Sequence, residues 1–79
     1  MKTETQIAEE NIELFKYCEM GEAKYYRMIL NEHKASCQRF LEFLEYMVQI
    51  KMGKRILGKF KEKITDLKNA IKKYDEAGI

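Results

Sequence analysis

The chain has 79 residues, of which 46% are hydrophobic and 35% charged, with no proline and four glycines. This composition is typical of one mostly helical domain and excludes a disordered chain, and no apolar run approaches the ~20 residues of a membrane span. The N-terminal residues include no apolar signal segment, so we expect a cytoplasmic protein. A single core of this size yields only ~3–5 kcal/mol of net stability, which favours association with another chain.

Charge is distributed unevenly along the chain. Residues 1–50 carry six basic and nine acidic side chains, whereas residues 51–79 carry nine basic and four acidic ones. The opposite net charges predict an acidic helix packed beside a basic helix. Alternatively, the basic segment faces a polyanion.

A first helix is predicted over about residues 4–20. Thr3 followed by Gln6 fits a capping box, in which each side chain accepts a hydrogen bond from the other residue's backbone N–H. Asn11 interrupts the apolar stripe expected to face inward, which consists of Ile7, Leu14, Phe15 and Cys18. Gly21 is the natural stop, because glycine readily takes the left-handed conformation that ends helices. A bent helix that continues through Gly21 is the alternative.

Two longer helices are predicted next, over about residues 22–52 and 54–76. The apolar residues of the first alternate at spacings of four and three, with His33 in the series: Tyr26, Leu30, Cys37, Phe40, Leu44 and Met47. The second shows the same alternation: Leu57, Phe60, Ile64, Leu67, Ile71 and Tyr74. Such spacing defines long amphipathic helices.

These two helices are expected to form an antiparallel hairpin packed like a coiled coil, with a turn near Gly53 and an end at Gly78. Reversal near Gly53 predicts the facing pairs: Leu44 with Ile64, Phe40 with Leu67, Cys37 with Ile71, and His33 with Tyr74. Reversal at Gly21 predicts two further pairs: Leu14 with Met28, and Ile7 with Ala35. The predicted fold is therefore an all-α three-helix unit, in which a shorter N-terminal helix covers only the first half of the second helix.

The uncovered end of the second helix carries apolar residues on its flanks: Leu41, Phe43, Val48 and Ile50. A wide apolar face on a small protein more often marks self-association than a ligand site, and two-fold dimers are the commonest solution. We therefore expect these residues to form the interface of a homodimer, or a contact with another helical protein.

A ridge of basic residues follows one side of the third helix: Lys54, Lys61, Lys68 and Lys72. Each lysine of such a ridge could neutralise a phosphate, so nucleic-acid binding is the alternative function. Lysine dominates over arginine, and this disfavours bidentate recognition of bases.

Metal binding is not expected from the spacing of the possible ligands. His33 and Cys37 lie four residues apart on one helical face, and Cys18 and Glu32 could complete a zinc site. The predicted pairing places Cys18 ~18 Å along the helix from Cys37, which argues against that set. We expect His33 to be a core residue bonded to Tyr74 or Asp75, and both cysteines to be reduced.

Catalytic motifs are also missing from the sequence. It contains no Ser-His-acid arrangement, phosphate-binding loop or paired carboxylates in a predicted cleft, so we expect neither an enzyme nor a cofactor or small-molecule substrate. The runs from Asn31 to Leu44 and from Leu67 to Tyr74 resemble small uncharacterised helical proteins of archaea. This resemblance implies an archaeal source and no established activity. The predicted function is a non-enzymatic interaction or assembly module.

Overall fold

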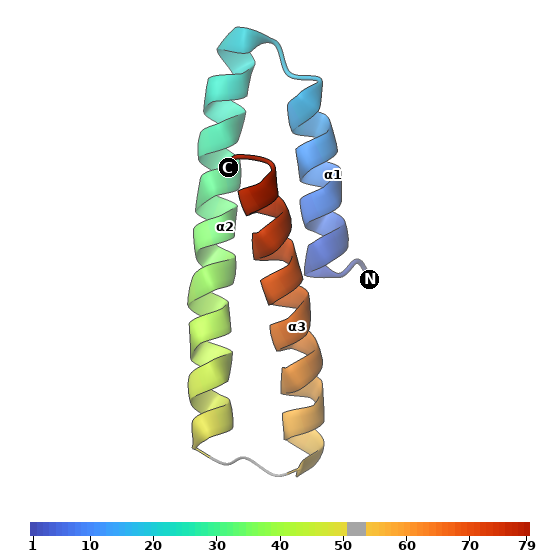
Figure 1. The fold of residues 1–79 in the computed structure, drawn as a ribbon, viewed down its shortest axis with the longest axis vertical. Coiled ribbons are helices and arrows are strands. Elements are labelled where there is room, and N and C mark those ends of the chain that lie inside the picture. Colours follow the sequence, from blue (N-terminus) through green and yellow to red (C-terminus); the bar gives the residue numbers. More distant parts are fainter. Residues whose placement is uncertain (51–53) are drawn as a thin grey trace.

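The computed structural model describes the backbone of residues 1–50 and 54–79 and the side chains of residues 1–50 and 58–79. The described backbone forms three helices and no strand: α1 (Glu4–Lys16), α2 (Met20–Gln49) and α3 (Lys54–Glu76). Helices α2 and α3 run antiparallel, and α1 lies beside one half of this hairpin, parallel to α3 (Figure 1). The molecule is a rod of 48 × 20 × 19 Å. The prediction of an all-α three-helix unit is confirmed.

The start of α1 follows the predicted capping box. The Gln6 N–H donates to the Thr3 hydroxyl at 3.1 Å, and the Thr3 N–H donates to the Gln6 side chain at 2.9 Å. These bonds satisfy two donors that the first turn of a helix leaves without intrahelical partners.

The connection between α1 and α2 differs from the prediction. Helix α1 ends at Lys16, and Gly21 lies in the first turn of α2, so both the stop at Gly21 and the bent continuous helix are wrong. Phe15 stacks on Tyr26 with ring centroids 6.4 Å apart, and Arg27 lies over the Phe15 ring. These contacts between α1 and α2 favour a chain reversal directly after Lys16. The turn predicted near Gly53 lies outside the described residues.

Gly78 ends α3 as predicted. Its φ of +80° is in the left-handed region, where a Cβ would be strained. The Ile79 N–H donates to the Tyr74 carbonyl and the Gly78 N–H to the Asp75 carbonyl, both at 3.0 Å. This is the Schellman arrangement, and it folds Ile79 back onto Tyr74.

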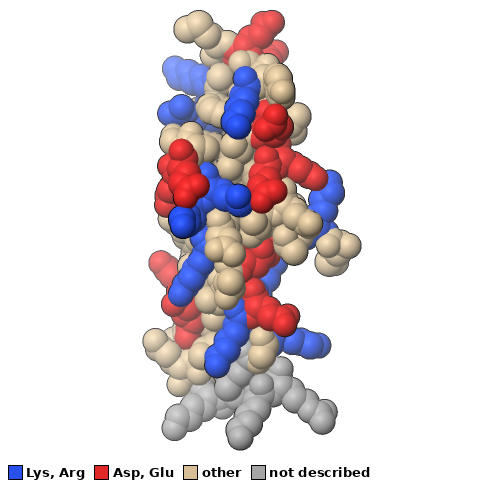
Figure 2. Space-filling view, turned by 45° about the vertical axis from the view of Figure 1, so that its right-hand side comes forward, with Lys and Arg blue, Asp and Glu red and all other residues tan. Residues whose placement is uncertain are grey.

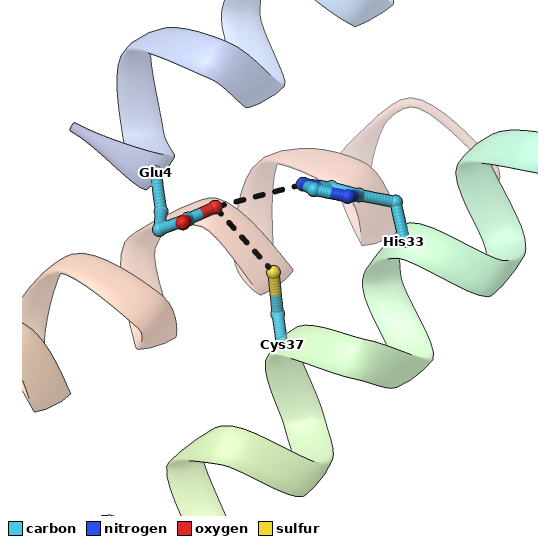
Figure 3. Close-up of side chains that lie close together, drawn as sticks. All are labelled: Glu4, His33 and Cys37. Carbon is cyan, nitrogen blue, oxygen red and sulfur yellow. Dashed lines mark hydrogen bonds and ion pairs between the residues drawn. The ribbon is translucent and has the colours of Figure 1, made fainter. Parts of the chain in front are cut away.

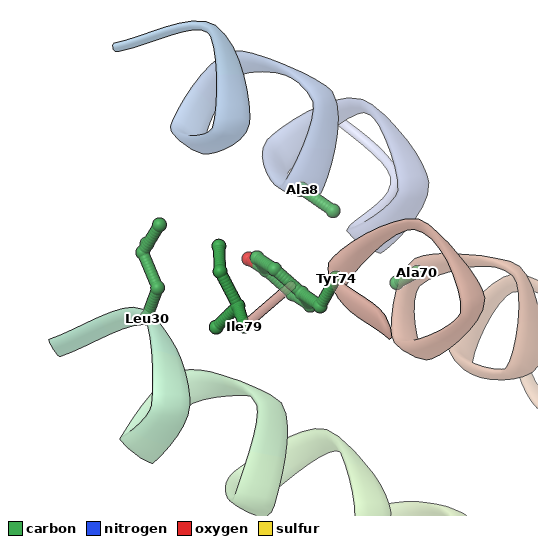
Figure 4. Packing of buried hydrophobic residues seen from close by; sticks show 5 residues of the cluster. All are labelled: Ala8, Leu30, Ala70, Tyr74 and Ile79. Carbon is green, nitrogen blue, oxygen red and sulfur yellow. The ribbon is translucent and has the colours of Figure 1, made fainter. Parts of the chain in front are cut away.

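The half of the rod that contains α1 has a core formed by all three helices. Its buried residues are Ala8, Leu30, Ala70, Tyr74 and Ile79 (Figure 4). Small alanines on α1 and α3 let these two helices approach closely, and Tyr74 and Leu30 fill the space beside them.

The other half has a core formed by α2 and α3 alone. Cys37, Leu44 and Leu67 are buried there, and four partly buried residues pack around them: Leu41, Phe60, Ile64 and Ile71. This cluster agrees with the predicted hairpin. Phe40, predicted to face Leu67 in the core, is the exception. It is 43% exposed, and the Lys63 ammonium lies 5.8 Å from the centre of its ring.

Helix α1 uses a different face from the predicted one. Leu14 and Met28 are both about 60% exposed, so their predicted pairing is wrong. Phe15 packs against the core as predicted, and the other inward residues are Ala8 and Ile12. Asn11 also faces the core, where its amide donates to the Tyr74 hydroxyl at 3.1 Å. The difference arises because α1 packs mainly against α3 and much less against α2, whereas the predicted pairs placed it on α2.

Asp66 of α3 holds the first turn of α1 in place. Its carboxylate accepts hydrogen bonds from the Glu4 N–H at 2.8 Å, the Thr5 N–H at 3.0 Å and the Thr5 hydroxyl at 2.7 Å. Burial raises the pKa of Asp66, but the bonds from the Thr5 side chain and from the two backbone N–H groups outweigh it and lower that pKa below its usual value. The charged carboxylate also suits the positive end of the α1 dipole.

This contact predicts an acid-dependent stability. Because the folded-state pKa of Asp66 lies below the unfolded value, its contribution is present above about pH 4 and is lost as the pH falls through the folded-state value. Asp66→Ala should lower the free energy of unfolding by about 1–2 kcal/mol at pH 7 and by less at pH 3. Chemical denaturation at both pH values measures the difference. Glu62→Ala, at an exposed position of the same helix, is the control, and an equal loss in both variants would contradict the assignment.

Candidate functional site

Helix α2 carries a second apolar face that the other two helices leave exposed. Seven large apolar side chains on it are between 43% and 72% exposed: Tyr25, Met28, Ile29, Phe40, Phe43, Tyr46 and Ile50. Five of them share an alternation of four and three residues with three polar positions, and this spacing keeps positions 25, 29, 32, 36, 39, 43, 46 and 50 on one side of a helix. Met28 and Phe40 flank this line on opposite sides. We call this surface the outer face of α2.

The outer face is distinct from the side of α2 that packs in the core. At 100° per residue, Leu30, Cys37 and Leu44 point about 120° away from the line of positions 25 to 50. Helix α2 is therefore apolar on two sides, and α1 and α3 together cover only one of them.

Polar residues occupy the middle of the outer face. Glu32, Ser36 and Arg39 are all exposed, and the Arg39 guanidinium donates to the Ser36 hydroxyl at 3.2 Å. Within the described part of the chain, neither Glu32 nor Arg39 takes part in an ion pair. The face thus has two apolar ends separated by one acidic and one basic side chain.

The four predicted interface residues do not form one surface. Phe43 and Ile50 lie on the outer face and are 55% and 53% exposed. Leu41 packs against the core of the hairpin. Val48, which lies seven residues after Leu41 on the same side of α2, is half-buried. Tyr25, Met28, Ile29 and Tyr46 were not among the predicted interface residues, although the alternating positions of Tyr25, Ile29 and Tyr46 could have revealed these three.

The predicted basic ridge is exposed where the structure describes it. Lys61, Lys68 and Lys72 lie on the surface, whereas the side chain of Lys54 is outside the described residues. Lys72 lies 4.0 Å from Glu76. On the face drawn in Figure 2, basic and acidic side chains are interleaved along the rod. Nucleic-acid binding by this ridge stays a prediction.

A polar cluster joins α1 to α2 near the middle of the rod. Glu4, His33 and Cys37 point toward one another (Figure 3). The Glu4 Oε2 atom lies 3.5 Å from His33 Nε2 and 3.9 Å from Cys37 Sγ. One donor atom from each of the three residues lies within 4.8 Å of the others.

The cluster is partly shielded from water, because 37% of the His33 side chain and 23% of the Glu4 side chain are exposed. Cys37 is buried, and burial together with the Glu4 carboxylate raises the pKa of its thiol to about 11. The His33 Nε2 atom is buried and has no hydrogen-bond partner among the residues whose side chains the structure describes. Lys63 lies 3.6 Å from the other Glu4 carboxylate oxygen.

This cluster differs from the ligand set considered from the sequence. Cys18 lies near the α1–α2 turn, where its thiol donates to the Leu14 carbonyl, and Glu32 is on the outer face. His33 lies beside Tyr74 as predicted and meets its ring edge-on at 6.0 Å. The predicted hydrogen bond is wrong, because none joins His33 to Tyr74 or Asp75. Asp75 pairs with Lys34 instead. Only the docking of α1 brings Glu4 to His33, and no sequence motif signals it.

Comparison with known proteins yields no relative: no family model, curated protein or solved structure matches the chain. The resemblance to archaeal proteins therefore stays a prediction. Among the described residues, no helix combines the length and the apolarity needed to cross a membrane.

Proposed function

We propose that the protein is a non-enzymatic assembly module whose working unit is a homodimer joined along the outer face of α2. The observation that carries this proposal is the pair of exposed apolar ends of the outer face, one around Tyr25 and Ile29 and the other from Phe43 to Ile50. Their alternating spacing is the pattern by which one helix packs along another.

The charges in the middle of the face support an antiparallel pairing of two copies. A two-fold axis near Ser36 brings Glu32 of each copy within one helical turn of Arg39 of the other, which forms two favourable pairs. A parallel pairing would instead place Glu32 beside Glu32 and Arg39 beside Arg39. The antiparallel arrangement also matches the apolar ends, since the Tyr25 end of one copy meets the Ile50 end of the other.

The size of the face is that of a small protein interface. Between positions 25 and 50 the helix is about 38 Å long and at least about 10 Å wide, an area of about 400 Å² before side-chain relief is counted. This estimate covers the whole face, including Glu32, Ser36 and Arg39 in its middle, so two such faces would bury about 800 Å², which is at the low end for protein interfaces. Burial favours association, but lost rotational and translational freedom offsets much of the gain.

Sedimentation equilibrium tests the proposal. The unmodified protein should be a dimer at micromolar concentration, and Phe43→Glu combined with Ile50→Lys should be a monomer. Both side chains lie outside the two cores, so the monomeric variant should keep its helical circular dichroism. Its melting temperature should be lower, because association stabilises the folded state by mass action.

Leu14→Glu is the matched control. Leu14 is as exposed as the two interface residues but lies on α1, so this variant should remain dimeric. A monomeric parent protein, or a dimer that survives the double substitution, would overturn the proposal.

A further inference from the structure

We propose that Glu4, His33 and Cys37 form a binding site for one divalent transition-metal ion of the zinc type. The inference rests on the geometry of this cluster and is independent of the proposed dimer. The three side chains lie between α1 and α2, away from the outer face of α2.

The spacing of the donor atoms suits a single ion. Zinc bonds of ~2.0 Å to oxygen and nitrogen and ~2.3 Å to sulfur, at tetrahedral angles, separate the ligand atoms by about 3.3–3.5 Å. The separation between Glu4 Oε2 and His33 Nε2 is 3.5 Å, and that between Oε2 and Cys37 Sγ is 3.9 Å. The remaining separation is within 4.8 Å, so small side-chain movements complete the arrangement.

The His33 Nε2 atom is a second, independent observation that points to a ligand. Within residues 1–50 and 58–79 it is buried without a hydrogen-bond partner, even though a carboxylate oxygen lies 3.5 Å away. A buried polar atom without a partner is costly, and coordination by the lone pair of a neutral imidazole would remove that cost. Mixed nitrogen, sulfur and oxygen donors are those that zinc and related borderline ions accept.

Neighbouring residues hold the three ligands in position. The Glu4 backbone is fixed by its hydrogen bond to Asp66, and Lys63 engages the carboxylate oxygen that faces away from the cluster. Tyr74 supports one edge of the His33 ring. Such outer contacts orient metal ligands and tune their affinity.

Binding would have two consequences. The Cys37 Sγ proton passes to solvent when the ion takes its place, so uptake releases about one proton per site. Three protein ligands also leave a fourth position for water or for an external ligand. Because Glu4 belongs to α1 and the other two ligands to α2, the ion would fasten α1 to the hairpin.

The test uses the untagged, reduced, full-length protein freed of metal. Titration calorimetry with Zn²⁺ should give one ion per chain, and Co²⁺ should produce the near-ultraviolet charge-transfer band of a thiolate ligand. Cys37→Ser should abolish that band and weaken binding at least about tenfold. Cys18→Ser is the matched control and should leave both readouts unchanged.

Glu4→Gln provides a variant that leaves the buried thiol intact. It should weaken zinc binding at least about tenfold while the cobalt band keeps its thiolate character. Circular dichroism verifies that each variant is folded. The proposal is overturned if the parent protein takes up no stoichiometric ion, or if Cys18→Ser weakens binding as much as Cys37→Ser.

Discussion

Leu67→Asp should unfold the protein. Leu67 is 1% exposed and is buried in one cluster with Cys37 and Leu44, in the part of the core that α2 and α3 form alone. A carboxylate at this position has no buried cation to pair with in the cluster, and the substitution also removes a large apolar side chain. Each effect costs several kcal/mol, against a net stability of only ~3–5 kcal/mol for a chain of this size.

Far-ultraviolet circular dichroism at neutral pH measures this effect directly. The variant should show the spectrum of an unfolded chain at 25 °C, without a cooperative thermal transition. Lys68→Asp, at the next position but on the exposed side of α3, should retain a native spectrum. A helical, cooperatively melting Leu67→Asp protein would show that α2 and α3 do not pack through this residue.

Tyr74→Ala should cost about 3–5 kcal/mol, the range for removing a large buried aromatic side chain. Tyr74 is fully buried where the three helices meet, in one cluster with Ala8, Leu30 and Ile79. Its removal would leave a cavity beneath α1 and would expose the edge of His33. The variant should therefore unfold in much less urea than the parent protein, if it folds at all.

Tyr74→Phe separates packing from hydrogen bonding. The phenylalanine ring keeps the shape and loses only the hydroxyl that accepts from Asn11, so the cost should be about 1–2 kcal/mol. Urea denaturation of both variants at the same protein concentration makes the comparison. Equal losses would contradict the packing role assigned to the ring.

The hairpin was predictable because its information is local and periodic. In α3 the apolar residues recur without interruption, and Leu67, Ile71 and Tyr74 face the core as their spacing predicts. The capping box at Thr3 and the stop at Gly78 follow from the chemistry of a few neighbouring residues. Such features need no knowledge of the tertiary structure.

The position of α1 was not predictable in the same way. Its contacts depend on two alanines that allow close approach to α3 and on the capping of its first turn by Asp66, more than 60 residues away in sequence. Neither signal appears in an apolar stripe, so Leu14 was assigned to the core and Ala8 was overlooked. The cluster of Glu4 with His33 depends on this same docking.

The two apolar sides of α2 present a different difficulty. Tyr26 and Leu30 belong to the core side, whereas Tyr25 and Ile29 lie one position earlier on the outer face. Two stripes displaced by one residue merge into a single broad stripe in the sequence. Only the positions of α1 and α3 reveal which side they cover.

Exchange of the charges at Glu32 and Arg39 tests the antiparallel dimer most directly. Glu32→Arg alone and Arg39→Glu alone should each weaken self-association roughly tenfold in sedimentation, because two favourable pairs become repulsive. An equimolar mixture of the two variants should associate as a heterodimer with parental affinity, since every pair is then favourable again. Single variants that dimerise as tightly as the parent protein would contradict the antiparallel pairing, because a parallel pairing already places like charges together.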